Sequence, residues 1–251
     1  MDDAQEALKN LVERLHEAAR DNLESIILYG SGARDDFHQG HSDLNVLCIL
    51  RSLRVADLAR VSPVVKWWNS VLHQPAPLFF SADELRRSAD VFAIELLDMQ
   101  RSHRLLFGSD FISGLAVPMN LHRLQVEHEL RTLALKLRQH FLRDAENRKE
   151  LAAVLVQSFS GALTLLRHTL IAFQQQPPDT PSEIFRRIAA LTGANGAAFD
   201  AVSQMRAAKN LDQDAVPAVY DGYLAALETV IVALDHHLPK HQWQRAAKTS
   251  A

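Results

Sequence analysis

A glycine-serine turn between two apolar runs constrains this chain more than any other feature. Residues 25–29 are apolar, and Gly30-Ser31-Gly32 follows them at once. A second apolar run, residues 44–50, begins soon afterwards and is preceded by Asp43. Short apolar runs bounded by glycine are typical of buried strands. The pattern predicts two neighbouring strands joined by a tight turn and a short connection.

Two familiar phosphate-binding motifs do not fit this turn. In a dinucleotide-binding fingerprint the third glycine would stand where Asp35 stands. The second run also begins too soon, because a βαβ unit takes about 30 residues or more. A P-loop is excluded because no Gly-Lys-Ser/Thr follows the turn. An ordinary tight turn with a capping serine remains the structural alternative.

The residues around the turn resemble those of a known superfamily. Gly30-Ser31, Ala33-Arg34 and Ser42-Asp43-Leu44-Asn45 are similar to the motif of the nucleotidyltransferases, which include kanamycin nucleotidyltransferase and DNA polymerase β. That motif has Gly-Ser after the first strand, Ala-Arg on the next helix and Ser-Asp-x-Asp on the second strand. The wider sequence resembles uncharacterised bacterial nucleotidyltransferase-like proteins with a helical C-terminal half. The resemblance implies an α+β fold, with a small mixed-sheet core followed by an all-helical bundle.

The resemblance also assigns roles to the motif residues. Backbone N–H groups at Gly30 and Ser31, and the Ser31 hydroxyl, would hold the phosphates of a nucleoside triphosphate. Arg34 would add positive charge to the same phosphates. Asp43 and Asn45 stand two apart on a strand and therefore point to one face, where they would bind Mg²⁺. Asn45 takes the place of the second carboxylate, and its amide offers an oxygen but no charge.

A third acid is expected in such families, on a later strand and often as general base for the acceptor hydroxyl. Glu95 is the candidate, because residues 92–97 are otherwise apolar and a buried glutamate is costly unless it is paired or metal-bound. Asp98 is the second candidate, and it would face the opposite side of a regular strand. The alternative is that this segment is a helix with Glu95 on its solvated face.

Hydrophobic periodicity predicts the other elements. Helices are expected over residues 8–19 and 55–72, a strand over 78–80, a helix from a capping box at 81–84 to 87, and a short edge strand over 104–108. No strand pattern follows residues 114–118. Long helical patterns follow instead, over residues 121–143, 151–175, 182–191, 197–209 and 216–237, with Ser182 as an N-cap. Two domains are predicted, 1–114 and 115–251.

Charge and composition limit the binding partners and the cellular compartment that we expect. The net charge is −3 and the pI is about 6.5, so we expect no general attraction to nucleic acid or membrane. Cys48 is the single cysteine, which excludes an intramolecular disulfide. The N-terminus lacks the apolar segment of a signal peptide, and no apolar run is long enough to span a bilayer. The sequence predicts a cytoplasmic protein.

Two functional hypotheses follow. The first is a nucleotidyltransferase-like protein that binds a nucleoside triphosphate with Mg²⁺ and transfers the nucleoside monophosphate to a hydroxyl of a small molecule or protein. The second is a catalytically degenerate nucleotide-binding or protein-interaction module, as the loss of a carboxylate at Asn45 would produce. The sequence leaves the acceptor, the nucleotide base and the oligomeric state open.

Overall fold

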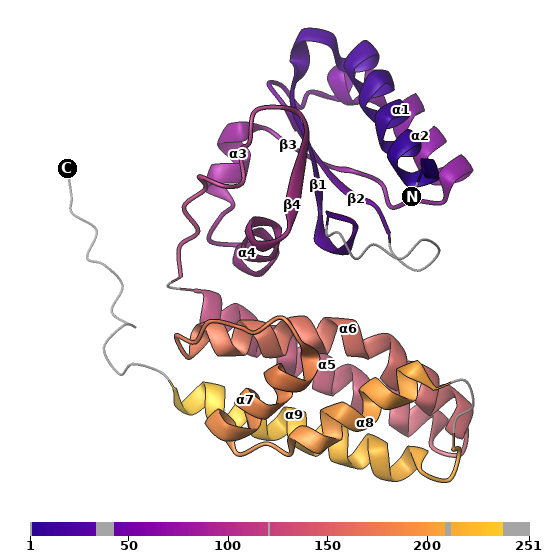
Figure 1. Cartoon of the computed structure of the whole chain (residues 1–251), viewed down its shortest axis with the longest axis vertical. Helices are drawn as coiled ribbons and strands as arrows, with labels where there is room; N and C mark the ends of the chain where they lie inside the picture. Colours follow the sequence, from indigo (N-terminus) through magenta and orange to yellow (C-terminus); the bar gives the residue numbers. More distant parts are fainter. Residues whose placement is uncertain (1, 34–42, 120, 209–211, 238–251) are drawn as a thin grey trace, which may run out of the picture. The chain divides into compact units, whose positions relative to one another are not determined.

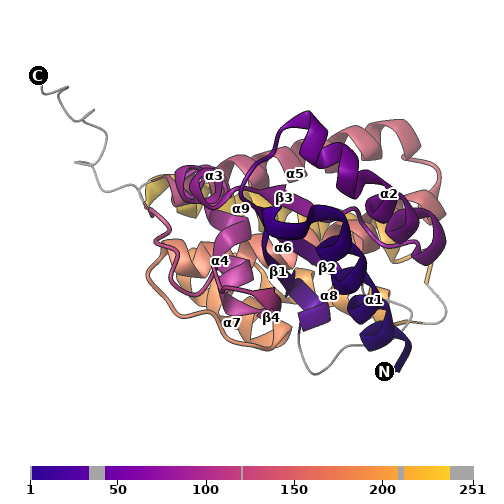
Figure 2. The same ribbon diagram turned by 90° about the horizontal axis from the view of Figure 1, so that it is seen from above.

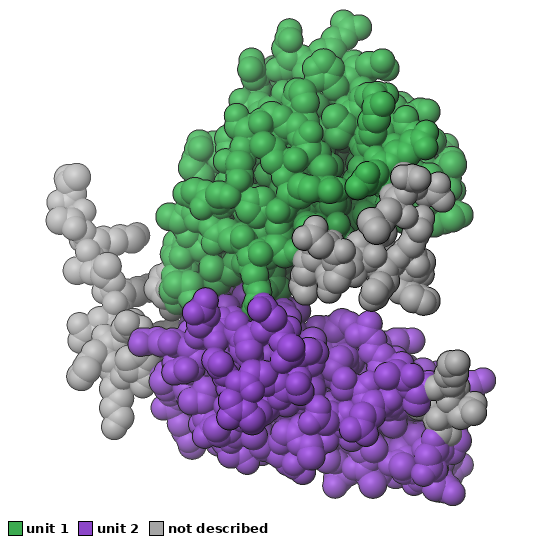
Figure 3. All heavy atoms as spheres, viewed as in Figure 1, with its two compact units in different colours: residues 1–119 green, residues 120–251 purple. Residues whose placement is uncertain are grey.

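The computed structural model describes residues 2–33, 43–119, 121–208 and 212–237, except for the side chains of Asp2, Asp3 and Ser31. The chain divides into two compact units, Met1–Met119 and Asn120–Ala251 (Figure 3). The first contains a sheet with helices, and the described part of the second is helical (Figure 1). This is the α+β fold with a helical C-terminal part that the sequence predicts.

The first unit is built on a four-stranded mixed sheet. Its elements are α1 (Asp2–Ala19), β1 (Leu23–Tyr29), β2 (Asn45–Leu50), α2 (Val55–Leu72), β3 (Leu78–Phe80), α3 (Ala82–Arg87), α4 (Ala93–Arg101) and β4 (His103–Gly108). The strand order is β3-β2-β1-β4. β1 pairs antiparallel with both β2 and β4, whereas β2 and β3 are parallel. The parallel pair needs a crossover, which α2 supplies.

Alternating side chains of β1 and β2 pack on opposite faces of the sheet. Ile26 and Cys48 belong to a cluster with residues of α1 and α2, such as Leu11 and Trp68. Ile27, Leu47 and Ile49 belong to a second cluster with residues of α3 and α4. Figures 1 and 2 show the two pairs of helices on the two faces. The central residues of both strands, such as Ile26–Leu28 and Val46–Leu50, are therefore apolar because both faces are covered.

One predicted strand is wrong. Residues 92–97 lie mostly in helix α4, and the fourth strand is β4, which pairs with β1 at the sheet edge. The buried residues of α4 are Ala93, Leu96 and Met99, at the three-residue spacing of a helix face. Burial of that face against the sheet selects the helix over an extended chain.

The second unit is a bundle of helices. These are α5 (His122–Asp144), α6 (Arg148–Ala172), α7 (Pro181–Thr192), α8 (Gly196–Ala207) and α9 (Val216–His236). Thr180 is the N-cap residue of α7 and Pro181 follows it, so the predicted cap at Ser182 is wrong. Proline suits the first turn because its missing N–H would have no helical partner there.

The sequence predicts no apolar run long enough to span a bilayer, but two helices of the bundle, α6 and α9, are long and apolar enough by length and composition. Core helices of water-soluble bundles pass the same test. Both helices supply buried residues to the bundle, among them Leu155, Leu166, Leu227 and Val230.

Two histidines are buried together between α5 and α6. His122 and His168 are 1% and 0% exposed, and His122 Nε2 lies 2.9 Å from His168 Nδ1. One ring nitrogen of such a pair donates and the other accepts. Burial, and then the charge that His168 would carry, lower the pKa of His122 to about 4. The pair is therefore most stable with His122 neutral.

Candidate functional site

The predicted phosphate-binding turn directly follows β1. Gly30 has a φ of +75°, in the left-handed region that favours glycine, and the turn continues as a 3₁₀ segment, Gly30–Ala33. The Gly30 N–H donates to the Ser102 carbonyl at 3.0 Å. The Gly30 carbonyl accepts from Ser102 Oγ at 2.9 Å. Because its own N–H is used in this way, Gly30 contributes the shape of the turn, and any phosphate donors of the turn would come from the following residues.

The structure brings this turn beside the start of β2. Tyr29 lies opposite Asn45 in the β1–β2 pair. A Cβ built on Gly30 would lie 3.5 Å from Asn45 Nδ2, and one on Gly32 would lie 3.3 Å from the Asp43 carbonyl oxygen. Asn45 is half-buried and Asp43 is exposed. Arg34 and Ser42 lie outside the described residues.

Glu95 is not on a strand, as predicted, but in the first turn of α4, where it is exposed. The alternative that the sequence left open, a helix with Glu95 on its solvated face, is the one found. Asp98 follows three residues later, so it lies near Glu95 on the helix rather than on the opposite side. The charge of Glu95 acts on Tyr29, the last residue of β1. Burial raises the Tyr29 pKa, and the charge of Glu95 raises it further.

No strand of the described sheet carries a carboxylate near Asn45. The one acidic residue on the described strands is Glu24, near the start of β1, and its Oε1 lies 3.5 Å from Arg51 Nε. β3, which runs beside β2, consists of Leu78, Phe79 and Phe80. Among the described helices beside the sheet, α4 carries the two predicted candidates for a third carboxylate, Glu95 and Asp98.

The donor set fits one magnesium ion better than two. Within the part of the chain that the structure describes, no group of three His, Cys, Asp or Glu residues could hold a metal ion. Of the predicted ligands, Asp43 would supply one carboxylate and Asn45 one neutral amide oxygen. A two-ion clamp needs more negative charge than this. One Mg²⁺ needs less, because it commonly binds one or two carboxylates together with substrate phosphates and water.

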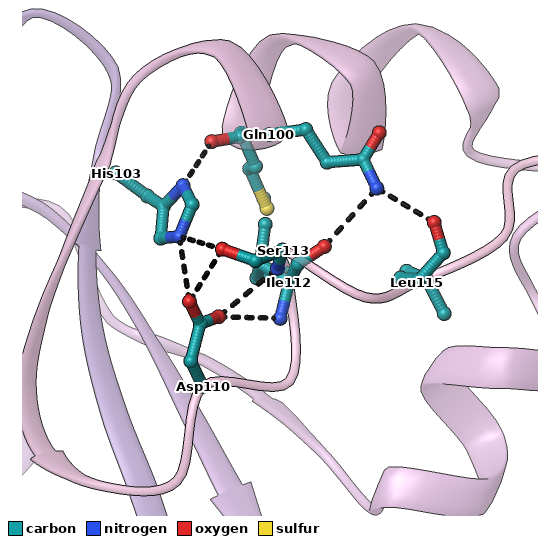
Figure 4. A network of polar contacts seen from close by, with 7 residues as sticks. Gln100, His103, Asp110, Ile112, Ser113 and Leu115 are labelled. Carbon is teal, nitrogen blue, oxygen red and sulfur yellow. Dashed lines mark hydrogen bonds and ion pairs between the residues drawn. The ribbon is translucent and has the colours of Figure 1, made fainter.

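A polar network that the sequence did not reveal lies just beyond Ser102 (Figure 4). His103 Nδ1 is 2.9 Å from the Met99 carbonyl, and His103 Nε2 is 3.2 Å from both Asp110 Oδ2 and Ser113 Oγ. The Ser113 hydroxyl also donates to Asp110. In a catalytic triad the serine and the aspartate would bond opposite ring nitrogens. Here they share one, so the network anchors the chain after β4 and does not form a nucleophile.

Asp110 organises that anchor. Its carboxylate accepts the N–H groups of Ile112 and Ser113 at 2.9 and 3.0 Å. Hydrogen bonds from Ser113, opposed by partial desolvation, hold the pKa of Asp110 well below its usual range. Gln100 of α4 donates to the carbonyls of Ile112 and Leu115. The end of α4, the start of β4 and the following turn are thereby tied together.

The helical unit has a separate surface groove of about 300 Å³. Its lining comes from α5 and α9 and comprises Arg131, Ala134, Leu135, Arg138, Glu228, Ile231 and Val232. Arg138 pairs with Glu228 at 2.6 Å. None of the motif residues lines this groove.

Comparison with known proteins bears on the fold. No protein-family model matches the chain, and no curated protein matches it. Among solved structures, it is similar to the crystal structure of spectinomycin adenyltransferase AAD(9) from Enterococcus faecialis with ATP and spectinomycin. The two are 13% identical, the match covers 89% of this chain and 99% of that one, and the TM-score is 0.53.

The chain therefore has a nucleotidyltransferase fold. This is the fold that the resemblance of the sequence motif implies. At 13% identity, the likeness does not carry substrates or activity from one protein to the other.

Proposed function

We propose that this protein binds a nucleoside triphosphate with Mg²⁺ and transfers the nucleoside monophosphate to a hydroxyl of a small molecule or protein. The observation that carries this proposal is the contact between the glycine turn and the start of β2. Gly30 follows β1 and Asn45 opens β2, and a Cβ at Gly30 would lie 3.5 Å from Asn45 Nδ2. ATP is the first nucleotide to test, since the similar adenyltransferase structure contains ATP.

Each motif residue has a role in the proposal. Gly30 gives the turn its shape, and Ser31 and Arg34 bind phosphate oxygens. Asp43 and Asn45 hold a magnesium ion that travels with the triphosphate and neutralises phosphate charge. Glu95 is the base, with Asp98 as the alternative.

The proposed transfer is a single displacement. The acceptor hydroxyl oxygen bonds to the α-phosphorus, and the bond from that phosphorus to the bridging oxygen of pyrophosphate breaks. The hydroxyl proton passes to the Glu95 carboxylate, and pyrophosphate leaves. Catalysis of this kind depends on positioning and charge neutralisation. With one carboxylate in the motif instead of two, we expect slow turnover.

The second candidate is a catalytically silent nucleotide-binding or interaction module. It is favoured by Asn45 and by a sheet that offers no carboxylate beside it. A silent nucleotide-binding module differs from the enzyme in turnover and not in nucleotide binding, whereas an interaction module needs neither. We propose a cytoplasmic location for either, in accord with the composition.

The first experiment is a thermal-shift titration with the four common ribonucleoside triphosphates, with and without Mg²⁺. At a hundredfold excess over Kd, binding adds about 2.7 kcal/mol to stability. For a chain of this size that is a rise of roughly 5 to 10 °C. Asp43→Asn should remove the magnesium-dependent part of the shift. No shift with any triphosphate would contradict the enzyme and the nucleotide-binding module, and would favour a protein-interaction module.

Turnover is then measured with the triphosphate that binds, labelled at its α-phosphate. Spectinomycin and the protein itself are the first acceptors, and pyrophosphate release reports transfer to others. Pyrophosphate release that depends on acceptor and on Glu95 supports the enzyme. Binding without release under any of these conditions supports the silent module.

A further inference from the structure

Ser102 lies at the junction between α4 and β4, in a fixed backbone position. Its N–H donates to the carbonyls of Asp98 and Met99, at 3.1 and 3.2 Å, and so closes the end of α4. The next residue, His103, is anchored to Met99 and to Asp110 (Figure 4). Ser102 is therefore held from both sides of the chain.

From this position Ser102 makes two hydrogen bonds to a single residue of the glycine turn. Its carbonyl accepts the Gly30 N–H at 3.0 Å, and its hydroxyl donates to the Gly30 carbonyl at 2.9 Å. These bonds hold the peptide groups on both sides of Gly30 and so fix its conformation, with φ at +75°. A glycine without such contacts would exchange readily between left-handed and right-handed regions.

The second of these bonds determines where the Ser31 N–H points. The Gly30–Ser31 peptide is trans, because the described chain has no cis peptide bond. In a planar trans peptide the C=O and N–H bonds point in opposite directions. Since Ser102 Oγ binds the Gly30 carbonyl, the Ser31 N–H is directed away from Ser102. Ser31 is the second residue of the 3₁₀ segment Gly30–Ala33, the turn that the proposed function assigns to the phosphates.

We propose that Ser102 is a positioning residue for the triphosphate. Its hydroxyl sets the Gly30–Ser31 peptide plane, and that plane aims the Ser31 N–H at a phosphate oxygen. The inference rests on the proposed function, since the same turn binds the nucleotide there. Ser102 itself touches no phosphate in this arrangement and acts through Gly30.

The test compares three variants by calorimetry, with Mg²⁺-ATP and with Mg²⁺-tripolyphosphate as probes. Ser102→Ala removes the hydroxyl, and we expect both Kd values to rise about fivefold, as for one lost neutral hydrogen bond. Ser102→Thr keeps a hydroxyl and should stay within about twofold of the wild type. Ser158→Ala is the matched control, because Ser158 Oγ also donates to a backbone carbonyl, that of Leu155 in the helical unit. It should leave both Kd values unchanged.

Amide hydrogen exchange at Gly30 in the free protein tests the effect of Ser102 on the turn separately from nucleotide binding, because it needs no ligand. Ser102→Ala should speed this exchange about fivefold, whereas Ser158→Ala should not. If the wild type binds and Ser102→Ala binds equally well, the inference is overturned and the proposed function stands. If the wild type binds neither probe, the proposed function fails, and the positioning role fails with it. If Ser102→Ala leaves the rate of amide exchange at Gly30 unchanged, the Ser102 hydroxyl does not help to fix the Gly30 conformation, and the inference fails at its first step.

Discussion

Asn45, the first residue of β2, lies directly opposite Tyr29, the last residue of β1. Tyr29 in turn lies opposite His103, the first residue of β4. The three residues form a row across one end of the sheet, beside the glycine turn. Asn45 points to the same face as Leu47 and Ile49, which is the face that α3 and α4 cover. A charge introduced at position 45 would therefore face α4.

Asn45→Asp should strengthen magnesium-dependent nucleotide binding. A second carboxylate on this face adds charge and a ligand for Mg²⁺, and we expect about a tenfold lower Kd for Mg²⁺-ATP, or about 1.4 kcal/mol. Calorimetry with and without Mg²⁺ measures this, and Asn45→Ala is the control that should bring no gain. Equal magnesium dependence in Asn45→Asp and the wild type would argue against a metal-binding role for this position.

Gly30→Ala should impair both stability and nucleotide binding. A left-handed conformation costs a residue with a Cβ about 1 to 2 kcal/mol. Gly193, after α7, offers a matched control, because its φ is +77° and nothing lies within 4 Å of a Cβ there. Both variants should lose similar stability in urea unfolding, but only Gly30→Ala should bind ATP more weakly. Equal binding by the two variants would show that the turn conformation is unimportant for the nucleotide.

Glu95→Gln should lower the pKa of Tyr29. Burial raises that pKa first, and the Glu95 charge raises it further, so removing the charge leaves only the effect of burial. The chain has three tyrosines, and burial raises the pKa values of Tyr220 and Tyr223 to about 12. Tyrosinate absorbance against pH follows the titration, with Tyr29→Phe to assign it.

The control for this titration is Glu228→Gln, which removes a carboxylate from the helical unit. It should leave the Tyr29 titration as in the wild type. An unchanged Tyr29 pKa in Glu95→Gln would place the Glu95 charge too far from β1 to serve the site.

The buried histidine pair should make the protein less stable in mild acid. The pKa of His122 is about 4 in the folded chain and about 6.5 in an unfolded one. As pH falls from 6.5 to 4, the unfolded state takes up a proton that the folded state does not. Stability is therefore full above pH 6.5 and falls by about 3 kcal/mol towards pH 4.

Urea unfolding across this pH range measures the effect. His122→Gln removes the titrating group, and its stability should depend less on pH than that of the wild type. His128, exposed on the same helix, provides the control His128→Asn, which should keep the wild-type slope. A wild-type slope in His122→Gln would assign the acid sensitivity to other groups.

The sheet and most helices could be predicted from the sequence because their patterns are local. β1 and β2 are apolar runs bounded by glycine or polar residues, and α2 was expected at the bounds that it has, Val55–Leu72. The Ser81–Glu84 capping box forms, with both of its hydrogen bonds present. In each case a short stretch of sequence contains the interactions that determine the element.

The α4 segment shows where this approach fails. Phe92, Ile94 and Leu96 alternate as in a strand, while Ala93, Leu96 and Met99 repeat as in a helix. Short apolar runs are ambiguous between the two, and contacts with the sheet decide. The longer spacing that reaches Met99 was the signal that favoured the helix. Because of this error Glu95 was expected on a strand, whereas it lies on the exposed face of a helix.

Ser102 could not be found from the sequence at all. It carries no motif, and its bonds to Gly30 join residues 72 apart. Pairings of that kind depend on how β4 docks beside β1, and a local pattern does not encode the docking. The residue types of the motif were therefore visible, but the residue that orients the turn was not.

The same separation has a consequence for the growing polypeptide. During synthesis Gly30 emerges 72 residues before Ser102, an interval of roughly 4 to 14 s at ordinary translation rates. Over that time β1 and β2 can pair, but the residue that closes the turn has yet to be made. Under the proposed function, a nascent chain that already contains the complete motif would hold its turn less firmly, and would bind nucleotide more weakly, until β4 has been translated and has joined the sheet.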